Sequence, residues 1–339
     1  FPIHDGAEFL GVMDFFSREV RQPSQELFAM MSGICGQISQ SIQRSRAEAR
    51  LQREDEQRRL AREIQEGLLP KSAPPLPGFT FGARSWPSYD VGGDYFDAFL
   101  MKDGSLALVI GDASGHAIGP ALVIAATRAY IRAFAMTSLD PSTILTLANQ
   151  RLCEDHASSH FVTLFFGRLD SHTGSLTFAG AGHFPGYVLS PEGQVKAALT
   201  SQGMPLGIDS ANEYPPGPAA QLAAGDLLFL QTDGIVEAGS AGSVGQFGIE
   251  RTLDILRAHR KETPDQILDA IYRAAWSFSP SCDHADDMTA IVVRADAGNQ
   301  TRVVPSAETR HDSATPGISC PAASSMNSPS YMSSSTLKA

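Results

Sequence analysis

Leu106-Ala-Leu-Val-Ile-Gly-Asp-Ala-Ser-Gly-His116 joins an apolar run to an acidic turn of small residues. An apolar run of this length, bounded by turn residues, predicts a buried strand. Asp112 then lies where the strand leaves the core, so that its carboxylate is at the end of a sheet. This one stretch therefore predicts a core strand and a polar group at the strand's end.

Three further acidic sites follow the same design. Asp233 ends the apolar run 226–231, Asp286 and Asp287 begin the apolar run 288–293, and Asp94 follows the alternating stretch 79–86. For any one site, an Asp-Gly turn is ordinary turn chemistry. If the four strand ends meet at one sheet edge, however, the carboxylates require cations, because unpaired buried charges are costly. Four such sites together therefore favour metal binding.

The composition limits the class of protein. The chain has 339 residues and a net charge of −11, which allows two or three domains and argues against non-specific binding of nucleic acid. Its four cysteines are scattered and form no C-x-x-C pair, so a reducing cytoplasm is expected. No apolar run approaches the roughly 20 residues that span a bilayer. Because the sequence begins at Phe1 in mid-pattern, we expect it to be a fragment of a longer protein.

Residues 1–45 and 46–77 precede the main domain. The stretch Phe9–Phe16 predicts a strand, and apolar residues recur at helical spacing from Leu27 to Ile42. Residues 45–69 are rich in Arg and Glu at i, i+4 spacing, which predicts a solvated connecting helix. This helix would either pair with its twin in a homodimer or act as a plain linker. The helix should end at Pro70, and 71–77 form a stiff connector.

Residues 78–296 carry the main domain, and residues 297–339 are a Ser-, Thr- and Pro-rich tail that we expect to be disordered. Short turns between neighbouring strands imply mostly antiparallel pairing, and helices in pairs then cover the sheet faces. The fold class is therefore α+β. Strands are expected near 79–86, 96–101, 105–111, 161–169, 175–180, 186–190, 194–198, 226–231 and 288–294, and helices near 120–136, 140–156, 249–259 and 263–278.

The candidate site has only oxygen ligands. Asp94, Asp112, Asp233 and Asp286 are hard donors, and no His or Cys cluster accompanies them. Such a set suits Mg²⁺ or Mn²⁺ rather than Zn²⁺ or copper. Two ions about 4 Å apart can activate a water and orient a phosphate for attack. The sequence shows no phosphate-binding loop, nucleophile elbow or zinc-protease motif that would indicate another chemistry.

Six motifs occur in the order seen in bacterial metal-dependent protein phosphatases of the sporulation stage II protein E and RsbU type, within the type 2C (PPM) family. They are Gly92-Gly-Asp-Tyr-Phe-Asp97, Gly111-Asp-Ala-Ser-Gly-His116, Ala179-Gly-Ala-Gly-His-Phe-Pro185, Thr232-Asp-Gly234, Phe247-Gly248 and Asp286-Asp-Met-Thr289. The lead-in Glu63-Ile-Gln-Glu-Gly-Leu-Leu-Pro70 resembles that group's regulatory helix. Residues 1–45 resemble, over a shorter stretch, the C-terminal end of a GAF sensory domain.

The resemblance implies an αββα sandwich of two mainly antiparallel sheets with two Mg²⁺ or Mn²⁺ ions at one end. By matching motifs, Asp112 would bridge both ions with help from the Ala113 carbonyl, and Asp94, Asp233 and Asp286 would complete the ligand set. Asp94 and Asp112 are thus the catalytic residues it implies, and Asp287 would be a supporting residue.

The sequence departs from the family pattern at several positions. Ala117 replaces the usual glycine, and the phosphate-binding arginine of eukaryotic relatives has no clear match, since Arg84 is expected to have a surface role. His116 is a candidate general acid, for which a positioning role is favoured. His183 is expected to be a packed loop histidine, and His284 is expected to face solvent.

The leading hypothesis is a phosphoserine/phosphothreonine protein phosphatase that uses a metal-activated water. The resemblance implies a phosphorylated anti-sigma-factor antagonist of the STAS type as the substrate. From the acidic charge we expect no nucleic-acid partner, and from the lack of a spanning run we expect no membrane partner for this fragment. A catalytically weak signalling adaptor with the same fold is the alternative, supported by Ala117 and the missing arginine. A metal-dependent phosphodiesterase or nucleotide hydrolase is a third interpretation.

Overall fold

The computed structural model describes residues 1–5, 8–16, 18–20, 22, 24–68, 70, 74–88, 92–115, 118–155, 160–239, 245–278 and 286–296. The predicted tail from residue 297 lies outside the described residues, as do His116, Ala117 and His284.

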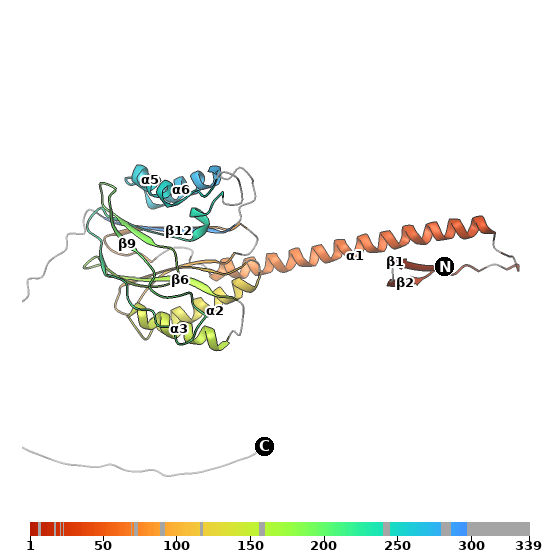
Figure 1. Cartoon of the computed structure of the whole chain (residues 1–339), viewed down its shortest axis with the longest axis horizontal. Helices are drawn as coiled ribbons and strands as arrows, with labels where there is room; N and C mark the ends of the chain where they lie inside the picture. The colour runs from red at the N-terminus through yellow and green to blue at the C-terminus, as the bar shows by residue number, and fades with distance from the viewer. Residues whose placement is uncertain are drawn as a thin grey trace, which may run out of the picture. The chain divides into compact units, whose positions relative to one another are not determined.

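Two five-stranded antiparallel sheets form the centre of the main domain (Figure 1). Sheet I has the order β10-β7-β6-β5-β4, and sheet II has the order β3-β12-β11-β8-β9. The strands of sheet I are β4 (Asp94–Leu100), β5 (Leu106–Ala113), β6 (Val162–Leu169), β7 (Ser175–Ala181) and β10 (Ala220–Gln221). Those of sheet II are β3 (Phe79–Trp86), β8 (Gly186–Leu189), β9 (Val195–Leu199), β11 (Leu227–Gln231) and β12 (Met288–Ala295).

Helices cover the outer faces of both sheets (Figure 1). Sheet I contacts α2 (Ile118–Ala135) and α3 (Pro141–Asp155), and sheet II contacts α6 (Pro264–Phe278), which packs with α5 (Ile249–His259). The short helix α4 (Asp233–Val236) follows β11. The predicted α+β fold with an αββα sandwich is therefore the observed architecture.

Alternation along β5 explains the continuous apolar run. Leu106, Leu108 and Ile110 belong to the core between the two sheets. Ala107 and Val109 point the other way, into the core under α2 and α3. Since neighbouring side chains of a strand face opposite sides of the sheet, a strand covered on both faces has no polar positions. A third core fills the space between sheet II and its helices.

The expected helix starts are confirmed by their side chains. The Asp140 carboxylate accepts a hydrogen bond of 3.0 Å from the Thr143 backbone N–H, ahead of Pro141 at the first position of α3. Thr263 and Gln266 form a capping box at the start of α6. The Thr263 N–H donates to the Gln266 side-chain oxygen at 3.0 Å, and the Gln266 N–H donates to the Thr263 hydroxyl oxygen at 3.3 Å. These contacts satisfy N–H groups that a helix leaves unpaired at its start.

The N-terminal part has a β-hairpin and one long helix. The hairpin consists of β1 (Pro2–Asp5) and β2 (Glu8–Val12), and α1 runs from Gln25 to Leu68 without a break. The expected strand 9–16 is wrong after Val12, where the side chains of Phe15 and Phe16 are exposed. Helix α1 includes both helical stretches that the sequence predicted separately. The domain boundaries at 45 and 77 stay predictions.

Helix α2 is attached to β4 by ion pairs with a buried carboxylate. By length and composition alone α2 could cross a membrane. In this fold, however, its Arg132 donates two hydrogen bonds of 2.7 Å to the fully buried Asp97 carboxylate. The Arg128 guanidinium lies 3.6 Å from the same carboxylate, and the Tyr95 hydroxyl donates to it at 3.0 Å. The arginines that interrupt this apolar helix therefore fix it to sheet I.

We predict that Asp97→Asn lowers the free energy of unfolding by about 2 kcal/mol, because the buried Asp97 carboxylate loses its charge and with it charge-assisted hydrogen bonds, each of which contributes about 1.5–3 kcal/mol. Urea unfolding measures the change. The matched control is Glu154→Gln, which breaks the exposed pair with Arg151 and should cost no more than about 0.5 kcal/mol. Equal stabilities of the two variants would contradict the prediction.

Candidate metal centre

Sheet I contributes two acids from neighbouring strands. Asp94 is the first residue of β4, and the antiparallel register places it opposite Asp112, near the end of β5. Asp94 is buried, whereas Asp112 is half-buried. Residues opposite each other on antiparallel strands have close side chains when they share a face. The register thus brings together two carboxylates that are 18 positions apart in the sequence.

Sheet II contributes acids from the matching ends of two paired strands. Strands β11 and β12 are antiparallel, with Gln231 opposite Ala290. Asp233 follows β11 and Asp286 precedes β12, so both lie at the same end of the sheet. The Thr232 hydroxyl donates a hydrogen bond of 2.8 Å to the Asp94 carboxylate, which links the ends of the two sheets. This bond places the acids of sheet II beside those of sheet I.

The electrostatics of the two sheet I acids show which charges face them. Burial raises the pKa of Asp94 well above its usual range, and the charges of Asp112 and Asp287 raise it further. Burial also raises the pKa of Asp112 to about 8, with contributions from Asp233, Asp286 and Asp287. Like charges raise one another's pKa only when they are close. The four predicted acids and Asp287 therefore form one cluster, which we call the acid cluster.

The two sheet II acids are perturbed in the same direction. Burial raises the pKa of Asp286 to about 6, and Asp233 and Asp287 add to the shift. Burial raises the pKa of Asp233, with a further contribution from Glu237. Within the described part of the chain, no three His, Cys, Asp or Glu side chains have the geometry of a formed metal centre. The acids are therefore gathered but are not arranged around a single point.

Asp287 has a different environment from its neighbour Asp286. It is buried, and its carboxylate accepts hydrogen bonds of 2.8 Å from the Gly93 N–H and 2.7 Å from the Ser88 N–H. The Ser88 hydroxyl donates a third bond at 3.0 Å. Asp286, by contrast, is exposed. Asp287 therefore holds the segment before Asp94, and Asp286 is the acid that is open to a ligand.

The two glycines before Asp94 are required by close approach. A Cβ on Gly93 would lie 2.8 Å from both the Ala113 carbonyl oxygen and an Asp112 carboxylate oxygen. A Cβ on Gly92 would overlap the Asp287 carboxylate. The Ala113 N–H also donates to the Gly93 carbonyl at 3.1 Å. The Ala113 carbonyl therefore lies at the acid cluster, as the sequence motif implies.

Sequence reasoning missed two side chains that contact the cluster or its supports. Thr232 binds Asp94, as described above, and its own oxygen accepts a hydrogen bond of 3.0 Å from the Thr289 N–H. The Gln65 side chain of α1 forms two hydrogen bonds with the backbone of Gly92. It donates to the carbonyl at 2.7 Å and accepts from the N–H at 3.2 Å. Thr232 belongs to the motif Thr232-Asp-Gly234, and Gln65 belongs to the lead-in segment 63–70. Their positions within these motifs could have indicated that both residues lie near the site.

The other candidates lie apart from the acids. Arg84 donates to Asp269 at 2.6 Å on the surface between β3 and α6. His183 is buried and contacts Thr163. His160, which the sequence analysis did not select, lies 2.9 Å from the Ser114 carbonyl oxygen through its Nδ1 atom. It supports the turn after Asp112.

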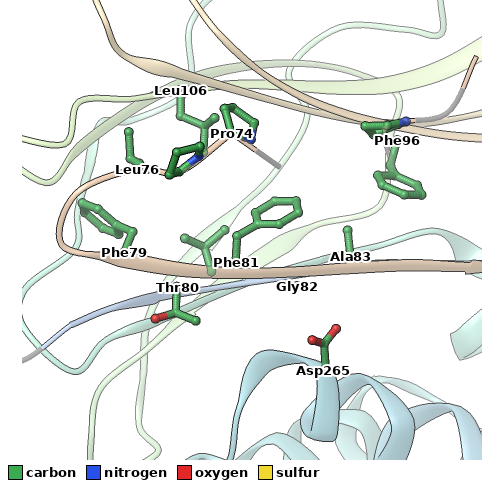
Figure 2. Close-up of a pocket in the computed structure, with 13 residues that line it drawn as sticks. Pro74, Leu76, Phe79, Thr80, Phe81, Gly82, Ala83, Phe96, Leu106 and Asp265 are labelled. Carbon is green, nitrogen blue, oxygen red and sulfur yellow. The ribbon is translucent and has the colours of Figure 1, made fainter. Parts of the chain in front are cut away.

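A cavity of about 440 Å³ lies elsewhere, at the edge of the sandwich (Figure 2). Its walls come from the connector at Pro74 and Leu76, from β3 at Phe79 and Phe81, and from Phe96 of β4. Strands β3 and β4 are the edge strands of their sheets. This cavity is therefore a gap between two sheet edges that the connector covers, and no acid of the cluster lines it.

Comparison with known proteins assigns the family. The family model described as stage II sporulation protein E matches residues 102–296, which is more than half of the chain. Protein IcfG of Synechocystis is 30% identical over 259 residues, which are 68% of this chain and 40% of IcfG. The phosphoserine phosphatase RsbU of Bacillus subtilis is 26% identical over 236 residues, which are 69% of each chain. The chain thus spans less than half of IcfG.

Solved structures confirm the predicted fold class. The PP2C domain of SiaA from Pseudomonas aeruginosa superposes with a TM-score of 0.65 at 24% identity, covering 73% of this chain and 99% of that domain. The phosphatase domain of SpoIIE from Bacillus subtilis, with a fragment of its regulatory domain, gives a TM-score of 0.56 at 22% identity, covering 64% of this chain and 63% of that one. The GAF-like assignment of residues 1–45 stays a prediction. On the family match and the shared fold, the chain belongs to the stage II sporulation protein E family and carries its PP2C-type domain.

Proposed function

We propose that the domain is a metal-dependent phosphoserine/phosphothreonine protein phosphatase that acts with two Mg²⁺ or Mn²⁺ ions. The single observation that carries this proposal is the acid cluster, in which Asp94, Asp112 and Asp286 all have pKa values raised by burial and then by neighbouring acids. Cations that neutralise the cluster would reverse this repulsion. Family membership and the name of the relative RsbU support the reaction class.

The donor set fits hard divalent ions. Carboxylates of Asp94, Asp112, Asp233 and Asp286 and the Ala113 carbonyl supply only oxygen, which is the ligand type of Mg²⁺ and Mn²⁺. Asp286 is exposed, so one side of the cluster is open to a phosphorylated side chain. When bound, such ions supply an activated water and neutralise charge on a phosphoryl group.

The protein's own residues would orient the ligands. The Thr232 hydroxyl donates a hydrogen bond of 2.8 Å to one Asp94 oxygen, and the Thr289 side chain also hydrogen-bonds this carboxylate. Asp287 holds Gly93 and Ser88, and so keeps the segment before Asp94 in place. Outer residues of this kind set the direction of ligand lone pairs and contribute to metal affinity. Asp112, which faces three other acids, would be a ligand of these ions.

The substrate and the signalling role are proposed from the sequence resemblance. We propose a phosphorylated protein of the STAS type as the substrate, within a cytoplasmic sigma-factor pathway; the relative RsbU is named as a phosphoserine phosphatase, which supports the reaction class. Helix α1 would pass a signal to the site through Gln65, which contacts Gly92 directly. Leu51, Leu60 and Ile64 of α1 are exposed, which supports pairing of this helix in a homodimer.

We predict that the full chain releases phosphate from a phosphoserine protein in the presence of Mn²⁺. Asp112→Asn should reduce kcat by more than the roughly 10–100-fold that loss of an outer-shell partner costs, because it removes a direct ligand. Asp103→Asn is the matched control. Asp103 lies in the turn between β4 and β5, at the opposite end of these strands from Asp94 and Asp112, and it pairs with Arg168 of β6. Phosphate release is followed colorimetrically.

Three outcomes of this assay distinguish the hypotheses. Equal rates for wild type and Asp112→Asn would refute the metal mechanism. Absence of turnover, together with no Mn²⁺ binding in calorimetry, would favour the signalling adaptor. Hydrolysis of cyclic dinucleotides without hydrolysis of phosphoproteins would favour the phosphodiesterase.

The metal-free protein should lose stability as the pH rises. The folded-state pKa of Asp112 is about 8 and lies above the ordinary value of 3.8 for this carboxyl group, so the folded state holds a proton that the unfolded state releases. The stabilisation that protonated Asp112 gives to the folded state is fully present below about pH 4 and is lost as the pH rises towards 8. In EDTA at pH 8.5, Asp112→Asn should therefore raise Tm by at least about 3 °C, the shift that 1 kcal/mol produces in a domain of this size.

Asp103→Asn should change stability in the opposite direction. Despite a raising contribution from partial burial, hydrogen bonds from Ser105 and Arg168 lower the pKa of Asp103 to about 2. The charged form therefore stabilises the folded state above about pH 4, and the variant should melt at a lower temperature at pH 8.5. Thermal melts at pH 6 and 8.5 test both signs, and a lower Tm for Asp112→Asn at pH 8.5 would contradict the electrostatic account.

Gln65→Ala should lower kcat with little change in global stability, because it frees the Gly92 backbone from α1 while the core stays intact. We expect a decrease of about 5–30-fold, which corresponds to a coupling of roughly 1–2 kcal/mol. Gln52→Ala is the matched control, as Gln52 is exposed in the same helix. If both variants retain wild-type kcat, Gln65 does not connect α1 to the site.

A further inference from the structure

Helix α6 runs along β3 and extends past the end of that strand. At the start of α6, a Cβ on Gly82 of β3 would lie 2.8 Å from the Pro264 side chain. Trp86, the last residue of β3, stacks on Tyr272, which is about two turns further along α6. Trp276 lies one more turn along the same face of the helix. The helix therefore carries Trp276 beyond the end of β3.

The three rings form one aromatic surface. Trp86 and Tyr272 are stacked, with their ring centroids 4.5 Å apart and their planes at 9°. The rings of Tyr272 and Trp276 follow at 5.5 Å. Trp86 and Tyr272 pack against the core under α5 and α6 and are half-buried, whereas 44% of the Trp276 surface is exposed. Both tryptophans of the chain thus belong to this partly exposed group, which we call the aromatic surface.

The aromatic surface begins beside the acid cluster. Trp86 is opposite Met288, the first residue of β12. Asp286 is two residues before Met288, so its backbone is at most about 7 Å away. Asp287, between them, accepts a hydrogen bond of 2.7 Å from the N–H of Ser88, two residues after Trp86. The aromatic surface and the acid that is open to a ligand therefore lie at the same end of sheet II.

The chemistry of this surface fits an apolar stretch of polypeptide. Tryptophan and tyrosine are enriched among the residues that contribute most to protein–protein binding. Arg84, the cation two residues before Trp86 on the same face of β3, already pairs with Asp269 at 2.6 Å. Its charge is therefore offset, and the aromatic surface offers mainly apolar contact area.

The size and place of the surface indicate which stretch of polypeptide would cover it. The three rings, spaced at 4.5 and 5.5 Å, extend over about three residues of an extended chain at ~3.3 Å per residue. A protein whose phosphorylated side chain enters the acid cluster must lay its neighbouring residues on the surface around Asp286. A small phosphate ester has no such neighbours and would not reach the rings.

We propose that the aromatic surface docks the apolar residues that flank the phosphorylated side chain of a protein substrate. This inference rests on the proposed function, because only a phosphoprotein substrate would cover both the acid cluster and the rings. It adds a reason for preferring proteins over small phosphate esters. Rings that only pack on the core would contribute to stability without affecting this preference.

The preference of the full chain for protein substrates tests the proposal. With Mn²⁺, the ratio of kcat/KM for a phosphorylated STAS protein to kcat/KM for p-nitrophenyl phosphate should fall about 10-fold in Trp276→Ala, through a higher KM for the protein. Trp276→Phe keeps a ring and should restore most of the ratio. An unchanged ratio in Trp276→Ala would overturn the proposal.

Met136→Ala is the matched control for loss of an exposed apolar side chain, since 77% of the Met136 surface is exposed. It precedes Thr137, whose carbonyl accepts from Lys102 in the turn between β4 and β5, at the opposite end from the acid cluster. Met136→Ala should leave the ratio unchanged. An equal fall in both variants would overturn the proposal. Dissociation of a dimer by Trp276→Ala in sedimentation would also overturn it, by assigning the surface to a second copy of the chain.

Tryptophan fluorescence separates this proposal from the proposed function, because both tryptophans lie in the aromatic surface. A phosphorylated STAS protein without tryptophan is titrated into the slow variant Asp112→Asn with Mg²⁺. Docking should shift the emission to shorter wavelength as the rings lose water, and Met136→Ala in the same background should give the same shift. Absence of a shift would overturn docking even in an active phosphatase. A wild type that hydrolyses neither substrate would refute the proposed function, and the emission would still decide whether the surface docks the protein.

Discussion

Repulsion among buried carboxylates at one end of the sandwich is the constraint on which the rest of the structure depends. Asp94 and Asp112 are opposite each other in neighbouring strands, and the charges of Asp233, Asp286 and Asp287 face them from the second sheet. Such a cluster opposes folding unless cations neutralise it. The fold supplies the compensating stability elsewhere, in three apolar cores and in polar contacts that each satisfy one acid oxygen. The same strands therefore contribute to stability through their core side chains and to the site through the acids at their ends.

The strands and their terminal acids could be predicted from the sequence because both depend on local pattern. The apolar run before Asp112 has no polar position, which is the pattern of a strand covered on both faces, and β5 is buried in this way. Turn residues mark where β11 ends before Asp233. The helix starts at Asp140 and Thr263 have side chains that satisfy the first N–H groups. Each of these features is decided by residues within a few positions of one another.

The convergence of the acids and their supports could not be predicted from local pattern. Thr232 and Asp94 are 138 positions apart, and only the facing of two sheets makes their hydrogen bond. The contact of His183 with Thr163 likewise depends on a crossover that periodicity does not show. The expected strand 9–16 was too long for a related reason. The alternation of apolar and polar residues predicts a strand but does not supply the partner strand that it must pair with, and β2 ends at Val12. The resemblance to a family, rather than spacing, supplied the convergence.

The loop before Asp94 connects the helix α1 to the acid cluster through few bonds. The Gln65 side chain hydrogen-bonds both the N–H and the carbonyl of Gly92. The N–H of the next residue, Gly93, donates to the Asp287 carboxylate, and Asp112 leaves no room for a side chain at Gly93. Because Gly92 and Gly93 have no room for side chains, a displacement of α1 cannot be absorbed by repacking there. It must either break the Gln65 contacts or move the segment that begins β4. A contact of this kind can couple two sites by the 1–3 kcal/mol that is typical of allosteric proteins, which is enough to change the affinity of the acids for the ions that we propose.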